Sequence, residues 1–335
     1  MTVTSLRRLI LIFLLLALGV ALSIASPAFL TLGNIMTLLQ EASLIGIIAV
    51  GFTFVMITGG IDISVGAIVG FAAMICVNFL VYSSLPVWLF VPVVIAIGGL
   101  IGLVNGFFIT RFRLPEFIVT LATRGVLTGL ALVIAVKSGG FVENVFIQDP
   151  AYLWFGSKIG PVHVVTIAFI LIAIIGQVLL KQTRFGTNVY ATGANRTAAK
   201  LSGVNTDRIQ FGVYAMTGIC SAIAAVFLSA RMMTGMPEMG AGSELMVIAA
   251  VVIGGTSFTG GVGDIPGTVL GVLFLALIQN GILKLGLSPY VQPIVIGGII
   301  TLTVIVDVWY KSLAERMISR AARQRRAQIA GQTQA

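Results

Sequence analysis

The sequence predicts an all-α, polytopic membrane protein of about ten transmembrane helices with an inverted five-helix repeat. Of its 335 residues, 58% are hydrophobic and only 9% are charged, whereas soluble domains carry about 25% charged residues. Apolar runs of about 20 residues, the length of helix that spans the hydrocarbon core, follow one another through nearly the whole chain. These runs do not alternate apolar and polar residues, which disfavours a membrane β-barrel.

The predicted helices form a single transmembrane domain, which occupies the whole chain and ends in a basic cytoplasmic tail at 310–335. The helices lie near residues 8–28, 36–57, 65–83, 87–109, 115–136, 161–180, 210–230, 244–257, 265–283 and 290–309.

The net charge is +9, and the basic residues favour one side of the predicted membrane. With the N-terminus in the cytoplasm, fifteen Lys and Arg residues fall inside and four fall outside, as the positive-inside rule requires. Arg124 lies within the fifth helix and counts for neither side. No recognition motif surrounds the basic residues, so the charge does not indicate binding to nucleic acid. We therefore expect both termini in the cytoplasm.

The first predicted helix has a second interpretation. Arg7 and Arg8 precede an apolar run that ends near the small residues Ser23 and Ala25, as in a cleavable signal peptide. We favour an uncleaved helix, and its removal would leave the other helices in the same orientation.

Several predicted helices contain glycines spaced four residues apart. This spacing lets helix backbones approach closely in lipid, and we expect packing to be the role of most of these residues. They are Gly66 and Gly70; Gly98, Gly102 and Gly106; Gly125 and Gly129; and Gly267 and Gly271.

Two polar breaks in the chain resemble each other. "TGGIDISVG" at 58–66 aligns with "TGMPEMGAG" at 234–242 at an offset of 176, and Asn105-Gly106 and Pro115 have counterparts at offsets of 175 and 174. Five helices separate equivalent points, so a second copy would cross the membrane in the opposite direction. The predicted halves span about 36–136 and 210–309. Chance matching is the alternative, because the chain contains 39 glycines.

Polar residues in and near these breaks are the candidates for translocation or gating. An ionisable residue at membrane depth is costly and marks a functional site by default. For Asp62 an equal alternative is a helix cap near Ser64 at a wet cytoplasmic turn. The candidates are Thr58, Asp62, Asn105, Glu116, Glu238, Glu244 and Asn280.

No constellation of residues indicates catalysis, a metal or a cofactor. The glycine-rich "GGTSFTGGVGDIPG" at 254–267 contains no Lys and lacks the form of a phosphate-binding loop. His163 is expected at the outer end of the sixth helix, and Cys76 and Cys220 are expected to be small core residues. We therefore expect no enzyme activity, with energy supplied by a gradient or by another subunit.

The longest polar segment expected inside the cell lies at 181–210. Within it, residues 195–203 predict a short helix that begins at the N-cap Asn195 and ends at Gly203. Ala198 and Ala199 are expected on one small-residue side that docks into a groove on a partner. An ordinary solvated loop is the alternative.

Four stretches, "TGGIDISVGA", "LPEFIVTLAT", "RFGTNVYATGANRTAAKLSGV" and "AVVIGGTSFTGGVGDIPGTVLGVL", carry a family resemblance. They resemble the ribose-type permeases of bacterial ATP-binding-cassette sugar importers, from about residue 35 to residue 309. The resemblance implies a multi-pass permease subunit in the inner membrane. It would work with a cytoplasmic ATPase, a periplasmic sugar-binding protein and a second permease copy, either identical or related.

The resemblance also implies which residues contact the ATPase, because the family's loop after the sixth helix carries a coupling helix. The matching positions here are Gly193, Ala194, Asn195, Ala198, Ala199, Leu201 and Gly203. The block around the eighth helix departs from the family's usual E-L-D-A-I-A, since Met246 stands where Asp is usual.

The expected mechanism is alternating access, driven by ATP that closes the partner ATPase and pulls on the coupling helices. The alternative is a secondary transporter, coupled to protons or sodium through Asp62, Glu116, Glu238 and Glu244. A scaffold or receptor without transport is a third class, which the repeat and the lack of a large soluble domain disfavour. The sequence leaves the identity of the sugar open.

Overall fold

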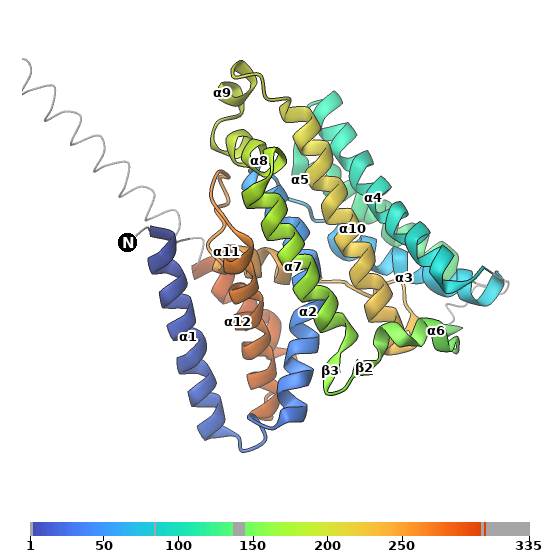
Figure 1. Ribbon diagram of the computed structural model, residues 1–335. Helices are drawn as coiled ribbons and strands as arrows, with labels where there is room; N and C mark the ends of the chain where they lie inside the picture. The colour runs from blue at the N-terminus through green and yellow to red at the C-terminus, as the bar shows by residue number, and fades with distance from the viewer. Residues whose placement is uncertain (1–2, 84, 137–144, 303–304, 306–335) are drawn as a thin grey trace, which may run out of the picture.

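The structure is a computed structural model that describes residues 3–83, 85–136, 145–302 and 305. It is a bundle of long helices with α1 (Val3–Ala25) at one edge (Figure 1). The predicted tail at 310–335 and the end of the predicted tenth helix lie outside the described residues.

Eight of the described helices are long and apolar enough to cross a membrane. Two shorter apolar helices, α11 (Ser243–Ile253) and Val291–Leu302, complete the series. Each predicted helix therefore has a counterpart in the same order, and the all-α polytopic fold is confirmed. The eight are α1, α2 (Leu32–Ile57), α3 (Val65–Tyr82), α4 (Val87–Arg111), α5 (Glu116–Ala135), α7 (Val164–Gln182), α10 (Thr206–Met232) and α12 (Ile265–Lys284).

The helix α11 is too short to span a bilayer alone. Its 11 residues rise about 16 Å at 1.5 Å per residue, about half of the hydrocarbon core. The polar segment before it completes the path by running along α3. A Cβ added to Gly66 would meet the carbonyl oxygen of Gly240, and one added to Gly70 would meet that of Pro237.

Short elements gather at the two ends of the bundle (Figure 1). One end carries α6 (Pro150–Leu153), a 3₁₀ turn at Trp154–Gly156 and a hairpin of β2 (Lys158–Ile159) and β3 (Val162–His163). There β1 (Val145–Phe146) also pairs antiparallel with β4 (Thr234–Gly235). The opposite end carries α8 (Arg184–Ala194) and α9 (Arg196–Leu201). The short helix α9 is predicted from the sequence but α8 is not, although Thr183 caps α8 by accepting a hydrogen bond from the Gly186 N–H.

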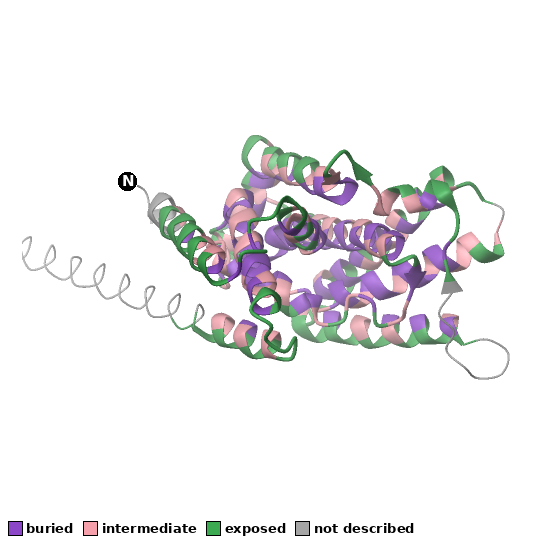
Figure 2. Cartoon of the chain, turned by 90° about the horizontal axis from the view of Figure 1, so that it is seen from below, coloured by how far each residue is buried: buried purple, intermediate pink, exposed green. Residues whose placement is uncertain are grey.

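The core lies around α2 and α10, where buried residues concentrate (Figure 2). The helix α10 packs against α4, α2 and α3, while α12 packs against α2. Cys76 and Cys220 are buried free thiols in this core, as predicted. His163 lies at the start of α7 and is also buried.

Glycines set the closest helix contacts. A Cβ on Gly218 of α10 would fall on the carbonyl oxygen of Gly98 in α4, and one on Gly102 would fall on that of Tyr214. Packing is therefore confirmed for the α4 glycines. Gly125 and Gly129 of α5 are exceptions, because no atom of the described residues lies within 4 Å of a Cβ added to either.

We expect Gly218→Ala to destabilise the fold, because the new Cβ would push α10 away from α4. Overpacking of this kind costs about 1–3 kcal/mol. Thermal unfolding of the detergent-solubilised protein measures the effect. The matched control is Gly297→Ala, a helical glycine with no atom within 4 Å of an added Cβ. Equal unfolding temperatures for the two variants would contradict the packing role.

Candidate functional site

The break between α2 and α3 holds a carboxylate inside the protein. Asp62 is fully buried, and its Oδ1 accepts hydrogen bonds from the Ser64 N–H at 2.9 Å and the Ser64 hydroxyl at 2.5 Å. Its Oδ2 has no hydrogen-bond partner among the described residues. Asp62 thus makes a local turn with Ser64, the N-cap of α3, which has no side-chain cap hydrogen bond. The predicted wet turn is wrong, because Asp62 is fully buried. The gating role stays a prediction.

A line of polar side chains connects this break to α4 and α5. Asn105 of α4 is fully buried and donates from its amide to the Ser64 hydroxyl oxygen at 3.0 Å. The Thr123 hydroxyl of α5 donates to the Asn105 side-chain oxygen at 2.6 Å. The structure therefore brings together two predicted residues, Asp62 and Asn105, through Ser64.

The start of α5 and a neighbouring part of α10 also contact the break between α2 and α3. The Glu116 carboxylate accepts a hydrogen bond from the Gln210 amide at 2.8 Å and lies beside Gly60, where an added Cβ would be 2.6 Å from its Oε2. The Tyr214 hydroxyl donates to the Ile61 carbonyl at 3.3 Å. These contacts leave little freedom for the backbone at 60–61.

An ion pair lies about two helical turns beyond Glu116 along α5. Arg124 and Glu244 of α11 are 3.0 Å apart, and their side chains are 42% and 4% exposed. Glu244 was a predicted candidate, but Arg124 was not. The available signal was a single Arg in the middle of an otherwise apolar transmembrane run, which is costly without a partner.

Three other predicted residues lie apart from the contacts around Asp62, Glu116 and Glu244. Thr58 donates to the Val55 carbonyl at the end of its own helix. Glu238 is exposed on the turn before α11. Asn280 of α12 exchanges side-chain hydrogen bonds with Asn34 at 2.9 and 3.0 Å, which joins α12 to α2.

The predicted helix at 195–203 is α9, and its ends are as expected. The Asn195 side chain accepts the Ala198 N–H at 2.9 Å, and Gly203 follows with φ +87°. One feature differs from the prediction: Ala199 is buried in its own chain, while Ala198 is exposed. Adjacent helix positions point about 100° apart, and in α9 the direction of Ala199 is the one that faces the rest of the chain. Leu201, which is 85% exposed, is the prominent apolar side chain here.

Three backbone segments come into close contact next to α9. They lie at the end of α2, at the end of α8 and in the glycine-rich loop before α12. The Gly261 N–H donates to the Ile57 carbonyl at 2.8 Å, and the Tyr190 hydroxyl donates to the Gly263 carbonyl at 2.6 Å. An added Cβ on Gly193 would fall on the Ile57 carbonyl oxygen. We call these segments, 57–60, 190–194 and 259–263, the glycine junction.

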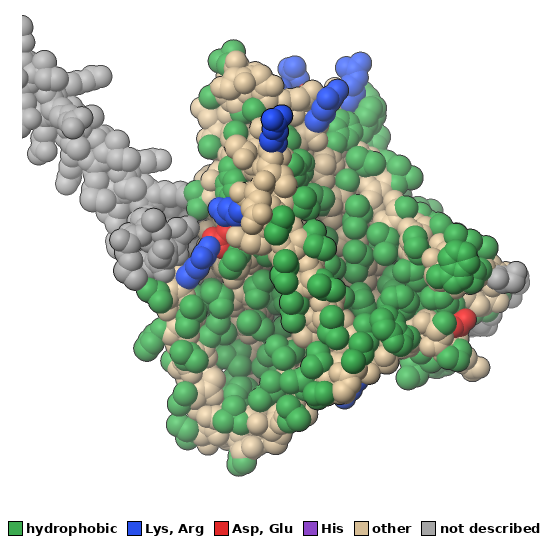
Figure 3. Space-filling model, in the orientation of Figure 1, with side chains coloured by type: hydrophobic (Ala, Val, Ile, Leu, Met, Phe, Trp, Pro, Cys, Tyr) green, Lys and Arg blue, Asp and Glu red, His purple; other side chains and the backbone are tan. Residues whose placement is uncertain are grey.

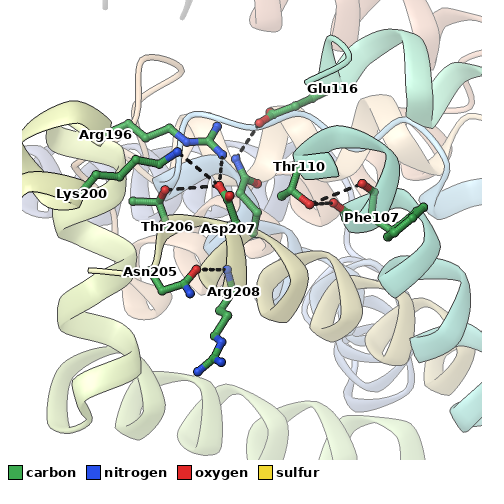
Figure 4. Close-up of polar contacts among 11 residues, drawn as sticks. Phe107, Thr110, Glu116, Arg196, Lys200, Asn205, Thr206, Asp207 and Arg208 are labelled. Atoms are coloured by element: carbon green, nitrogen blue, oxygen red, sulfur yellow. Dashed lines mark hydrogen bonds and ion pairs between the residues drawn. The ribbon is translucent and has the colours of Figure 1, made fainter. Parts of the chain in front are cut away.

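A groove of about 450 Å³ lies between α9, the start of α10 and the loop from α4 to α5. Arg196 and Lys200 both reach Asp207 across it, at 3.2 and 3.5 Å, and Glu116 lies at its edge (Figure 4). The ion pairs fix α9 against α10, although such exposed pairs contribute little stability.

Residues 34–304 match the family described as "Branched-chain amino acid transport system / permease component". The chain belongs to this permease family. The permease is 38% identical over 299 residues, 88% of its chain and 91% of the relative, to the "Ribose import permease protein RbsC" of Escherichia coli K12. It is 36% identical over 311 residues, 91% and 89% of the two chains, to the "L-arabinose ABC transporter permease protein AraH" of Azospirillum brasilense. No solved structure matches the permease.

Membership settles the class of the protein as a multi-pass permease of the inner membrane, and its relatives are transport proteins rather than enzymes. Met246 of the permease accepts a hydrogen bond at its sulfur from the Gln279 amide at 3.2 Å. Met246, at the position where the resemblance leads us to expect Asp, thus joins α11 to α12.

We expect Asn105→Ala to destabilise the permease by about 1–3 kcal/mol, because it removes a fully buried amide and leaves the half-buried Thr123 hydroxyl without its acceptor. Thermal unfolding of the purified permease measures the effect. The matched control is Asn78→Ala on α3, whose half-buried amide bonds only to the Met74 carbonyl of its own helix. A shift no larger than that of the control would show that the polar line is dispensable for stability.

Proposed function

We propose that this permease carries a monosaccharide into the cell as the membrane subunit of an ATP-binding-cassette importer. The observation that carries the proposal is identity of 36–38% over most of the chain to permeases named for ribose and L-arabinose. The family description names branched-chain amino acids, but these individual relatives match the chain nearly end to end. A separate ATPase and a periplasmic binding protein would supply energy and substrate.

The α9 end of the bundle is the proposed cytoplasmic end. Lys and Arg side chains gather there, above a broad apolar surface (Figure 3). Arg184, Arg196, Lys200 and Arg208 lie in or beside α8 and α9. Such a bias is the usual mark of the cytoplasmic side, and it supports placing both termini there.

The helix α9 is the proposed contact with the ATPase. It offers Leu201 and Ala198, three positions apart and both exposed, as an apolar docking face. The glycine junction lies directly behind α9 and connects it to the end of α2. A push on α9 would therefore reach the break that contains Asp62 through backbone contacts.

An inverted repeat is the proposed origin of the fold. Helix neighbours occur in matching sets: α10 packs on α4 as α2 packs on α12, and α10 on α3 as α2 on α11. The pair α3 and α4 also matches the pair α11 and α12. This pattern is what a two-fold axis in the membrane plane between halves 36–136 and 210–309 would produce.

The described acids give little support to ion coupling. Glu244 is paired with Arg124, Glu116 accepts a hydrogen bond from Gln210, and Asp62 is fully sealed. A second permease copy, identical or related, completes the proposed assembly.

The direct test is uptake by proteoliposomes that contain the permease with its ATPase and binding protein. We expect ATP-dependent uptake of at least one of D-ribose, L-arabinose and D-xylose, and none of leucine, isoleucine or valine. Permease alone should show no uptake when a proton or sodium gradient is imposed. Uptake by the permease alone would support the ion-coupled alternative, and uptake of the amino acids would overturn the sugar assignment.

Leu201→Ser should weaken retention of the ATPase about tenfold, since loss of a buried Leu contact costs about 1.5–3 kcal/mol. The permease itself should stay folded, because the side chain contacts solvent in the free chain. Co-purification of the ATPase with tagged permease measures retention. Leu287→Ser, another exposed Leu in the loop beyond the far end of α12, is the control. Equal retention in both variants would reject the docking face.

A further inference from the structure

Arg124 lies near the middle of a membrane crossing. It is eight residues beyond Glu116, the first residue of the 20-residue helix α5, which places it about 12 Å along the axis. The hydrocarbon core is about 30 Å thick. A guanidinium at this depth must face protein or water, because exposure to lipid is strongly unfavourable.

The surface of α5 beside Arg124 is open. The Arg124 side chain is 42% exposed, and Ala122 and Gly125 next to it are exposed as well. Neither Gly125 nor Gly129 has an atom within 4 Å of an added Cβ. Room for a small molecule or a second protein surface therefore lies directly beside a charged donor group.

Glu244 holds one side of the guanidinium and leaves the rest available. Its carboxylate is 4% exposed and lies 3.0 Å from one terminal nitrogen, Nη2. A guanidinium carries five N–H donors in a fixed plane, and no other ion pair or hydrogen bond from Arg124 is present among the described residues. The buried acid thus fixes the group, while its remaining donors are not consumed.

The other polar candidates lack this combination. Asp62 and Asn105 are fully buried and bonded to their neighbours. Asn280 is half-buried but bonded to Asn34. Arg124 instead is charged, lies near the middle of a membrane crossing and has a partly exposed side chain. Sugar hydroxyl oxygens are hydrogen-bond acceptors, and a planar donor fork suits two of them on adjacent carbons.

We propose that Arg124 contacts the sugar during its passage, donating hydrogen bonds to hydroxyl oxygens, and that Glu244 is the positioning residue for the guanidinium. This assignment rests on the proposed monosaccharide transport. It adds a substrate contact on α5 that discriminates between sugars by their hydroxyl pattern.

The first experiment measures sugar uptake by the complete assembly of permease, ATPase and binding protein. Arg124→Gln should lower the maximal uptake rate about tenfold, the usual effect of losing one charged hydrogen bond. Arg124→Lys keeps the charge without the fork and should retain an intermediate rate. The matched control is Arg231→Gln at the end of α10, which breaks a similar Arg–Glu pair with Glu41 at 2.5 Å. The control should change uptake less than twofold.

A double variant separates substrate contact from charge pairing. Arg124→Gln alone strands the buried Glu244 carboxylate, and this could disturb folding. Arg124→Gln combined with Glu244→Gln removes both charges, so a purely structural defect would be repaired. We expect the double variant to stay as impaired as Arg124→Gln, with normal co-purification of the ATPase. Recovery to at least half of the wild-type rate would overturn the proposal.

The second experiment uses deoxy analogues of whichever of D-ribose, L-arabinose and D-xylose the wild-type assembly imports. Loss of the contacted hydroxyl should slow uptake by the wild type but cause no further loss in Arg124→Gln. Comparing the two assemblies cancels the selectivity of the shared binding protein, as in a double-mutant cycle. If every analogue slows both assemblies equally, Arg124 makes no sugar contact. If the wild type imports none of the three sugars, the proposed function fails with it.

Discussion

The absence of water in the bilayer interior is the constraint on which the rest of this structure depends. A chain that leaves helical geometry there must find protein partners for every freed backbone group. Residues 58–64 leave helical geometry between two transmembrane helices, next to the glycine junction, and pair with protein groups. The Ile61 carbonyl accepts the Tyr214 hydroxyl, the Ile57 carbonyl accepts the Gly261 N–H, and Asp62 accepts the Ser64 N–H. One short break thereby requires α10 and the glycine-rich loop to pack where they do.

The same absence of water explains why the polar residues of α5 lie against protein. Its polar residues Glu116, Thr120 and Thr123 are half-buried or buried against protein, while its exposed side, apart from Arg124, is mostly apolar with glycines. In lipid the arrangement is favourable, since polar side chains are satisfied only against protein. The helix is bound to the α2–α3 break by hydrogen bonds and to α11 by the Arg124–Glu244 pair.

The lengths of the apolar runs were enough to predict the helices and their order, because the requirement to span the bilayer acts locally on the sequence. The N-cap Asn195 and the helix-ending Gly203 were predictable because helix capping also depends on local sequence. The faces along which the helices pack against one another were not predictable from local sequence. Gly125 and Gly98 share one spacing, yet one faces open space and the other touches α10. The partner of Arg124 lies 120 residues away on α11, and no local pattern identifies it. Ala199 was misplaced because burial of a short helix depends on what lies beneath it.

The glycine junction suggests how motion at α9 would reach the membrane interior. Where two side chains meet, rotamer changes can absorb a displacement of a few tenths of an ångström. At Gly193 the backbone lies against the Ile57 carbonyl, and a Cβ would fall on that oxygen. Gly261 is fastened to the same carbonyl by a hydrogen bond of 2.8 Å. A shift of α8 must therefore carry the end of α2 with it or break this bond. Contact between backbones gives a stiffer connection than side-chain packing, and a coupling that converts ATP binding into rocking of helices requires such stiffness.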